Sequence, residues 1–177
     1  TLKNELKMDF VEKWTLAEQK DELSVHKDFV NPRSWESLAK SPNVVGVWYP
    51  DSVQLESDEL GNQKIFNNNG KMIVLNGHVD VVPVGADTDW INGDAFSGHY
   101  NKTTDRVYGR GSTDMKGGNF ANLLALQAIQ YALEKSGRQR LPKTTVLFQS
   151  VVEEESGGAE TLAAVLRHKH LFPQSAS

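Results

Sequence analysis

Residues 72–83 read MIVLNGHVDVVP, and this stretch decides the fold that we expect for the chain. Its first four residues form a short apolar run, which is typical of a strand covered on both faces of a sheet. His78 and Asp80 follow with one residue between them, so in an extended chain both side chains leave the same face. Pro83 cannot donate to a strand ladder and ends the strand. The stretch predicts a buried strand that delivers two polar side chains at its carboxyl end.

The pair of His78 and Asp80 has two interpretations. Imidazole is a common ligand of zinc-like ions, and a nearby carboxylate either binds the same ion or accepts the other ring N–H. Alternatively, the two residues form a structural hydrogen-bonded pair at the strand end, which is the commoner outcome for an isolated His-x-Asp. Two further motifs favour the first interpretation: GRGSTDMKGG at residues 109–118 and VVEEESGG at residues 151–158.

The composition is ordinary for one globular α/β domain: 177 residues, 38% hydrophobic and 24% charged, with a formal net charge of −4. Basic residues form no block and do not alternate with aromatic residues, which argues against nucleic acid as a partner. The absence of cysteine excludes a disulfide framework and thiolate chemistry. No signal-like segment or membrane-length apolar run is visible, so we expect a cytoplasmic protein without a membrane partner.

The first 70 residues are predicted to supply structure and no chemistry. Apolar spacing predicts an amphipathic helix, then a strand, a short helical turn, a second strand, and a hairpin or mobile excursion rich in Asn and Gly. These elements are expected in this order at residues 2–20, 23–30, 31–43, 44–48 and 51–70.

After Pro83 the pattern becomes that of an α/β sheet. A long polar loop at 84–106 precedes a helix at 119–135, which carries apolar residues almost all round and should be largely buried. A core strand at 144–152 and a last helix at 158–167 follow. Strand, helix and strand in this order form a βαβ unit, and sites in such sheets lie at the carboxyl ends of strands. All three polar motifs fall there.

The two later motifs present carboxylates. GRGSTDMKGG carries Asp114 on a glycine-rich loop, departs from the dinucleotide fingerprint at that residue, and lacks the Gly-Lys-Ser/Thr ending of a phosphate-binding loop. A phosphate site is therefore a weak alternative. Glu153, Glu154 and Glu155 end an apolar strand, where adjacent carboxylates repel one another unless a cation lies among them. A solvated acidic loop is the alternative for this motif.

Taken in order, HVDVVP, Trp90 with FSG at 96–98, YGRGSTDMKGG and a strand ending in EEESGG closely resemble the catalytic domain of the M20 metallopeptidases. That family includes acetylornithine deacetylase, succinyl-diaminopimelate desuccinylase, aminoacylase-1 and glutamate carboxypeptidase. The resemblance implies a three-layer αβα sandwich with a mostly parallel central sheet. It further implies that residues 1–177 form a partial catalytic domain, without the dimerisation and lid domain of the family.

The resemblance also assigns metal ligands. His78 would bind one ion and Asp80 would orient its ring, while Asp114 would bridge two ions and Glu155 would bind the second ion. The expected cofactor is a pair of zinc ions, although histidine with carboxylates suits cobalt and manganese equally.

The function implied by the resemblance is hydrolysis of the amide bond in an N-acyl amino acid or a dipeptide. Two metal ions would polarise the scissile carbonyl and lower the pKa of a bridging water, while Glu154 would take its proton and pass it to the leaving amine. Glu153 occupies the variable acidic position of the pattern, and the bond Asp114-Met115 is expected to be cis. A small-molecule substrate is the expected partner, and a full-length member is expected to form a homodimer.

Each metal ion needs a further protein ligand for which the sequence offers no match. His168 and His170 follow a helix end and are expected to face solvent or to compensate the helix dipole. Two ligands per ion predict weak zinc binding and no appreciable amidase activity by residues 1–177 alone, together with an apolar surface prone to association. The alternative function is therefore a catalytically silent fragment or a binding module that retains the family fold.

Overall fold

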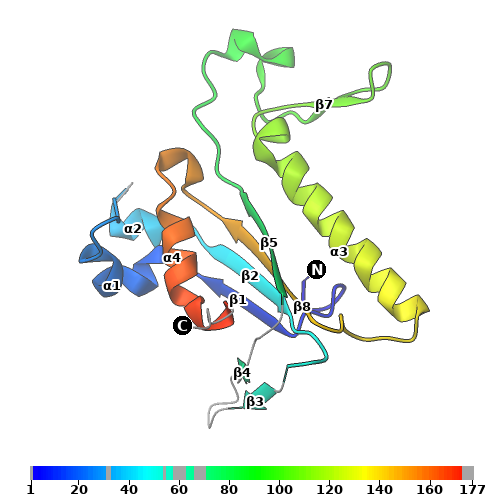
Figure 1. Ribbon diagram of the computed structural model, residues 1–177. Coiled ribbons are helices and arrows are strands. Elements are labelled where there is room, and N and C mark those ends of the chain that lie inside the picture. The colour runs from blue at the N-terminus through cyan, green and yellow to red at the C-terminus, as the bar shows by residue number, and fades with distance from the viewer. Residues whose placement is uncertain (1, 31–32, 54, 58–62, 66–70, 173–177) are drawn as a thin grey trace.

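The computed structural model describes residues 2–30, 33–53, 55–57, 63–65 and 71–172. At its centre lies a four-stranded sheet with the order β1-β2-β8-β5 (Figure 1). These strands span, in that order, Phe10–Trp14, Asn43–Trp48, Thr144–Val151 and Lys71–His78. Among the described strands, β5 and β8 are parallel, whereas β1 with β2 and β2 with β8 are antiparallel.

The expectation of a mostly parallel sheet is not confirmed in the described residues, because the sheet is mixed. Two adjacent parallel strands need a crossover connection, which α3, Gly117–Lys135, provides between β5 and β8. β2 runs opposite to both of its neighbours. The structure is therefore a mixed α/β fold in which one βαβ unit supplies the parallel pair.

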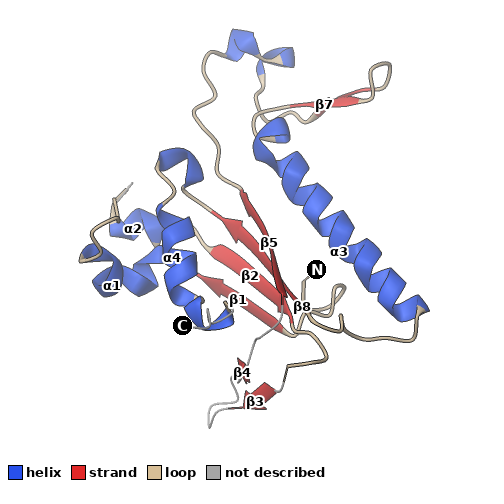
Figure 2. Cartoon of the chain, in the orientation of Figure 1, coloured by secondary structure: helices blue, strands red, loops and turns tan. Residues whose placement is uncertain are grey.

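Helices lie on both sides of this sheet, as Figure 2 shows. On one side, Leu126 of α3 packs in the same buried cluster as Phe148 of β8. On the other side, Ala163 of α4, Ala159–Arg167, packs in a cluster with Trp14 of β1. Because successive residues of a strand point to opposite faces, the apolar strands β2 and β8 serve both layers. The sheet thus separates α3 from α4. The carboxyl ends of β5 and β8 lie toward the N-terminal ends of both helices (Figure 1).

The N-terminal residues do not form the predicted amphipathic helix. Phe10 pairs with Val47 in the β1–β2 ladder, and the chain then turns through a short 3₁₀ segment, Leu16–Gln19. Within β1, Phe10 packs against one buried cluster, whereas Trp14 lies in a second cluster together with Leu16 of the 3₁₀ segment. Pairing with a distant strand overrides the local pattern here.

The strand predicted at residues 23–30 is also wrong. Lys20–Ser24 forms helix α1, and Leu23 is buried in the cluster beneath α4. Phe29 packs against the same cluster, whereas Val25 is 84% exposed, so the alternating residues do not share one buried strand face. The predicted strand end at Asn31-Pro32 lies outside the described residues.

The other predicted elements are confirmed. Helix α3, strand β8 and helix α4 follow the predicted order, and the helical turn, the second strand and the hairpin are present as well. The turn is α2 at Trp35–Leu38, and the hairpin pairs β3, Leu55–Ser57, with β4, Gln63–Ile65. Within and after the long loop, β6, His99–Asn101, pairs with β7, Arg106–Tyr108.

Helix α3 and strand β5 are more exposed than predicted. Within α3, Asn119 and Leu126 are the buried residues, while Phe120 and Tyr131 are each 62% exposed. Ile73 of β5 is also exposed, and no described strand pairs with the outer edge of β5. An apolar pattern identifies a face that favours burial but not whether another element covers it. The expected exposed apolar surface lies along these two elements.

A charged network joins β1 to the end of α4. His168 is 1% exposed, with Nε2 at 2.9 Å from Glu12 Oε2 and Nδ1 at 3.0 Å from the carbonyl oxygen of Ala164. Arg167 donates to Glu12 Oε1 from Nε at 3.1 Å and from Nη2 at 2.5 Å. The expectation that His168 faces solvent is therefore wrong, because the end of α4 packs its ring edge-on against Trp14.

Replacing Glu12 by glutamine is expected to lower the free energy of unfolding by about 1–2 kcal/mol at neutral pH, since charge-assisted hydrogen bonds are lost. Burial raises the pKa of Glu12, but the hydrogen bonds from Arg167 and His168 outweigh burial and hold this pKa below 4.5. Such a group contributes stability that is present above its unfolded pKa and is lost as the pH falls through its folded pKa. Denaturant titrations over the acid range should therefore show a smaller loss of stability for Glu12→Gln than for the wild type.

The matched control is Glu36→Gln, because the Glu36–Lys40 pair at 3.2 Å is highly exposed. Exposed pairs of this kind contribute little to stability. Equal losses for the two variants at neutral pH, with unchanged acid dependence in both, would contradict a stabilising role for the network.

Candidate metal centre

The three polar motifs meet at the carboxyl ends of β5 and β8. β5 ends at His78, which lies opposite Val151 of β8 in the parallel register. Asp114 lies in the irregular turn Ser112–Lys116, directly before α3, and a 3₁₀ turn at Glu154–Ser156 follows β8. The βαβ unit therefore brings residues that are distant in sequence to one edge of the sheet.

His78, Asp114 and Glu155 each offer a ligand atom, and these atoms all lie within 4.8 Å of one another. His78 Nε2 is 2.9 Å from Asp114 Oδ1, while the Asp114 side chain is 73% exposed. The predicted convergence of the three residues is confirmed, and their individual roles stay predictions. The peptide bond between Asp114 and Met115 is cis, as the resemblance implied.

Asp80 connects the ends of the two strands. The Nδ1 atom of His78 lies 3.1 Å from the backbone oxygen of Asp80 and 3.4 Å from its carboxylate Oδ1. The other carboxylate oxygen, Oδ2, accepts a hydrogen bond of 3.2 Å from the backbone N–H of Glu155. Asp80 thus contacts the ring of one predicted ligand and the backbone of another, which suits the predicted orienting role.

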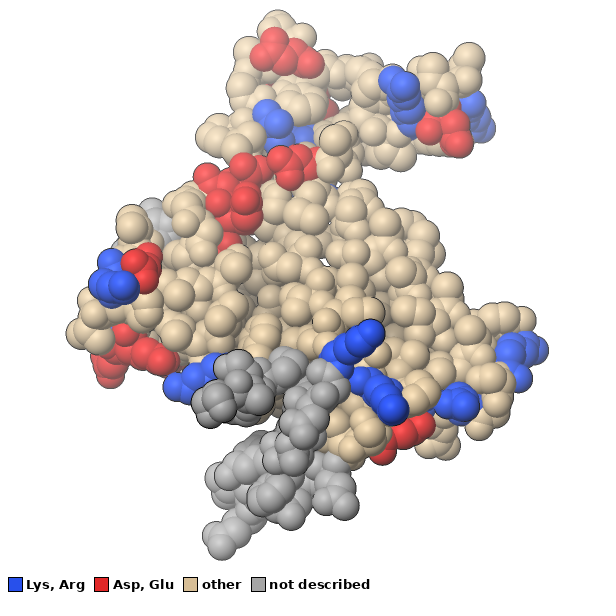
Figure 3. All heavy atoms as spheres, viewed as in Figure 1, with Lys and Arg blue, Asp and Glu red and all other residues tan. Residues whose placement is uncertain are grey.

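Negative charge surrounds His78. Burial lowers the pKa of its ring, but the hydrogen bond with Asp114, the backbone oxygen of Asp80, and the charges of Asp80 and Glu154 together raise this pKa above its ordinary value. Figure 3 shows acidic side chains gathered where the upper loops meet the body of the molecule, near the turn that follows β8. The same field that favours a proton on His78 favours a bound cation.

The three consecutive glutamates have three different environments. Glu153 is 3% exposed and forms an ion pair with Arg33, whereas Glu154 is exposed and Glu155 is half-buried. Glu154 Oε2 lies 3.8 Å from His78 Nε2. The acidic run is therefore not simply a solvated loop. Sequence reasoning missed Arg33 because its partner lies 120 residues away and no local pattern marks the contact.

Two residues that the sequence did not single out hold the backbone of the centre. Asn119, at the start of α3, donates from Nδ2 to the carbonyl oxygen of His78 at 2.6 Å. Lys116 donates from Nζ to the carbonyl oxygen of Val79 at 3.1 Å. The polar residues directly after a glycine-rich loop were the available signal, since such a loop allows a helix start to approach a strand closely.

Gly77→Ala is expected to lower the free energy of unfolding by about 1–3 kcal/mol, because the added methyl overpacks a filled site. A Cβ at Gly77 would lie 1.9 Å from Oδ1 of Asn119. The variant should therefore displace Asn119 from His78 and weaken zinc binding as well. Denaturant unfolding and zinc titration measure the two effects.

Gly118→Ala is the control for this substitution. Its Cβ would meet the flexible end of Met115 at 3.3 Å, and alanine favours the helical conformation of this position. Similar stabilities and similar zinc affinities for the two variants would contradict the close approach of α3 to β5.

Hollows border the predicted ligands. One of about 260 Å³ is lined by Asp114 and Glu155 together with the glycine-rich loop. A larger one of about 650 Å³ shares Gly109, Ser112 and Thr113 with it and reaches Trp90. Volumes of this size suit a small molecule.

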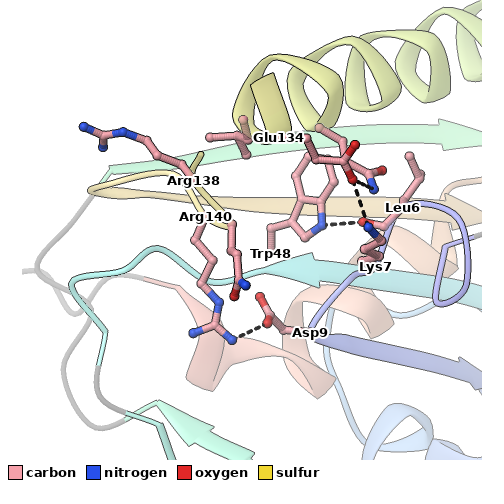
Figure 4. Close-up of a pocket in the computed structure, with 10 residues that line it drawn as sticks. Leu6, Lys7, Asp9, Trp48, Glu134, Arg138 and Arg140 are labelled. Carbon is pink, nitrogen blue, oxygen red and sulfur yellow. Dashed lines mark hydrogen bonds and ion pairs between the residues drawn. The ribbon is translucent and has the colours of Figure 1, made fainter. Parts of the chain in front are cut away.

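A separate pocket of about 300 Å³ lies at the opposite end of α3 (Figure 4). Its Lys7 and Glu134 form an ion pair of 2.9 Å, and Arg140 pairs with Asp9 at 2.6 Å. These carboxylates are thus engaged by basic side chains. Among the described residues, the grouping suited to a metal ion is the one at the ends of β5 and β8.

In the described part of the chain, every helix is too short or too polar to cross a bilayer. His170 is exposed, as predicted, and lies beside the buried ring of His168. These two histidines belong to the network at the end of α4, apart from the three predicted ligands.

A family model described as peptidase family M20/M25/M40 matches residues 74–175. The chain is 34% identical to the N-formyl-4-amino-5-aminomethyl-2-methylpyrimidine deformylase of Bacillus subtilis over 138 residues, which are 77% of this chain and 26% of the relative. It is 31% identical to succinyl-diaminopimelate desuccinylase 2 of a Ruegeria species over 126 residues, 71% of this chain and 25% of the relative. Identity to carboxypeptidase S of Saccharomyces cerevisiae is 38% over 104 residues, 56% of this chain and 17% of the relative. The chain spans about a quarter of the length of the first two relatives.

Proposed function

Because the chain belongs to peptidase family M20/M25/M40, we propose that it is part of a metal-dependent hydrolase that cleaves the amide bond of an N-acyl amino acid or a dipeptide. The observation that carries the proposal is the group formed by His78, Asp114 and Glu155, whose ligand atoms lie within 4.8 Å of one another. The names of the relatives support the class of reaction, since they describe a deformylase, a desuccinylase and a carboxypeptidase.

The donor set fits a divalent ion. One imidazole nitrogen and two carboxylates match catalytic zinc sites, which commonly use three protein ligands and leave a position open. Asp114 is largely exposed, so a substrate has access to this side of the centre. Zinc is the proposed metal, and cobalt or manganese suits the same donors. Divalent ions bound there would supply Lewis acidity to the scissile carbonyl and to a water nucleophile.

For the complete protein we propose that His78 and Asp114 would hold one ion and that Asp114 and Glu155 would hold a second. A carboxylate has two oxygens and can face two ions at once. The arrangement supports this proposal because Asp114 Oδ1 already lies 2.9 Å from His78 Nε2. In the described residues the three ligand atoms lie close enough to share one ion. For residues 1–177 alone we therefore propose one ion held by three ligands, in place of the two ions with two ligands each that the resemblance implied.

Glu154 is the proposed general base. Its side chain is 51% exposed, and it borders the centre without belonging to the group of predicted ligands. From this position its carboxylate can accept a proton from an attacking water and return it to the leaving amine. Asp80 is the proposed positioning residue, since it contacts both His78 and the backbone of Glu155.

The open edge of β5 supports the proposal that residues 1–177 form part of a catalytic domain. In its complete form, we propose a three-layer αβα sandwich with a mostly parallel sheet and a separate dimerisation and lid domain that makes the protein a homodimer. The alternative of a silent fragment or binding module is less well supported, because the named relatives carry enzyme names.

An amidase assay tests the proposal. Zinc-loaded protein that contains this chain should release free amine from an N-acetyl or N-succinyl amino acid or from a dipeptide. A chelator should abolish the release, and added zinc should restore it. Residues 1–177 alone should show no appreciable turnover. Substrate binding without release of amine, under saturating zinc, would favour the binding module instead.

A further inference from the structure

Glu160 is a buried carboxyl group that the proposed function does not use. It is the second residue of α4, its exposure is 0%, and neither carboxylate oxygen has a hydrogen-bond partner in the described part of the chain. An ionised carboxylate without partners is among the most costly groups to bury. A native structure that keeps such a group gives it either a proton or a partner.

The surroundings of Glu160 favour the protonated form. Burial is the largest cause that raises the pKa of Glu160 to about 8, and the negative charges of Asp80, Glu153 and Glu154 raise it further against the effect of its own backbone N–H. Glu153 is paired with Arg33, but Glu160 has no basic partner among the described residues. At neutral pH the group is therefore a carboxylic acid with one O–H to donate.

An acceptor for this O–H exists at the metal centre. Asp80 Oδ1 is buried and makes no hydrogen bond within the described residues, whereas Oδ2 is satisfied by the backbone N–H of Glu155. Asp80 is also the strongest of the three negative charges that act on Glu160. Asp80 Oδ1 is therefore a buried acceptor whose printed contact is the 3.4 Å approach of His78 Nδ1, and its charge acts on Glu160, whose own carboxyl oxygens have no hydrogen-bond partner in the described residues.

Two amide donors lie on the same side of the sheet. The side-chain nitrogens of Asn43 and Gln149 are buried and unpaired among the described residues. Gln149 pairs with Val45 in the ladder, and Asn43 precedes Val45 by two positions, so the two side chains leave the same face of the sheet. Asn43 also pairs with Trp14, which packs with Ala163, so this is the face that α4 covers. Unpaired buried polar atoms of this kind are the usual partners of a buried water.

We propose that Glu160 is a positioning residue: a neutral carboxylic acid whose O–H donates, directly or through one bound water, to Oδ1 of Asp80. This inference rests on the proposed metal centre. Asp80 faces His78 through its backbone oxygen and holds the turn of Glu155 through Oδ2. The hydrogen bond from Glu160 gives Oδ1 of Asp80 a donor and fixes the Asp80 side chain in the orientation that His78 and Glu155 need. Partners of metal ligands commonly change metal affinity by about 10–100-fold when they are removed.

Two variants test whether Glu160 acts as a hydrogen-bond donor, as a charge or only as a side chain that fills space. Glu160→Gln keeps the shape and an N–H donor, whereas Glu160→Met keeps the volume without a donor. Titration with zinc chloride in a calorimeter should give Glu160→Gln an affinity within about twofold of wild type and weaken Glu160→Met about tenfold or more. Equal affinity in all three proteins would show a space-filling role, and equal loss in both variants would show a role as a charge. Either result overturns the proposal.

Two metal-free readouts make this test independent of the proposed function. The infrared spectrum of the wild type at neutral pH should contain a carboxylic-acid C=O band that Glu160→Gln lacks. The ring ¹⁵N chemical shifts of His78 should differ from those of the wild type in Glu160→Met and should equal them in Glu160→Gln. Absence of zinc binding by the wild type would count against the proposed metal centre. The infrared band and the ring shifts would still show whether Glu160 is protonated and donates to Asp80. A missing band, or ring shifts that are unchanged in both variants, would overturn the proposal.

Discussion

Replacing Glu154 by glutamine is expected to slow amide hydrolysis by about 10²–10⁴-fold, which is the usual contribution of a general base. The substitution preserves the shape of the side chain but removes the proton acceptor. Because Glu154 lies outside the group of predicted ligands, the metal content of the protein should not change. Steady-state turnover of an N-acyl amino acid, measured together with metal analysis on an active protein that contains this chain, tests both parts.

Glu153→Gln is the neighbouring control. Glu153 is buried with Arg33 and takes no proposed part in proton transfer, so most of the turnover should remain. The variant should nevertheless unfold at lower denaturant concentration, because Arg33 loses its charged partner. Equal and mild losses of turnover in both variants would refute the assignment of the base.

Asp114→Asn is expected to abolish stabilisation of the fold by zinc. A ligand present at about 100 times its dissociation constant raises the free energy of unfolding by about 2.7 kcal/mol. Asp114 is the carboxylate beside His78, and its neutral replacement leaves the imidazole and Glu155 as the remaining donors. Thermal unfolding of wild type and variant, with and without zinc, measures the effect.

Asp87→Asn controls for the loss of a single negative charge. Asp87 is exposed in the loop after β5 and belongs to no group of ligand-type residues within the described chain. It should retain the full zinc-induced shift. A shift of wild-type size in Asp114→Asn, or its loss in both variants, would contradict the role of Asp114 as a ligand.

The central part of the fold was predictable because its signals are local. An apolar run followed by polar residues marks the end of β5, and the glycine-rich loop before a long apolar helix marks the start of α3. The βαβ rule then places the ends of β5 and β8 side by side. For this reason the three polar motifs could be grouped from the sequence, while the choice of Glu155 among the three glutamates depended on the resemblance to the M20 metallopeptidases.

The N-terminal region was not predictable in the same way. The spacing of Leu6, Phe10 and Trp14 fits one face of a helix, but Phe10 and Trp14 belong to a strand paired with β2. That pairing depends on Asn43–Trp48, which lies far along the chain. A helical period over so few apolar residues is matched equally well by a strand followed by a turn.

Side-chain contacts between residues that are distant in the sequence were not predictable. Arg33 lies 120 residues from Glu153, and His168 lies 156 residues from Glu12. Glu160 left a local signal, since it shares the buried face of α4 with Ala163 and Ala164 at helical spacing. A lone acid on an apolar helical face is thus the pattern that marks a buried carboxyl group.

The extent of burial also depends on more than the pattern. The apolar residues of α3 and β5 predict a covered helix and a covered strand, yet Phe120, Tyr131 and Ile73 are exposed. Their residue types record a preference for apolar surroundings, while coverage depends on which other elements are present. An exposed apolar surface of this kind is the property that most favours association.

Anomalous diffraction at the zinc absorption edge, from crystals of this chain grown with zinc, tests the central claim most directly. We predict a peak at about 2.0–2.2 Å from Nε2 of His78 and from carboxylate oxygens of Asp114 and Glu155. A crystal with no peak there, or with its strongest peak beside Glu12 and His168, would contradict a metal centre at the ends of β5 and β8.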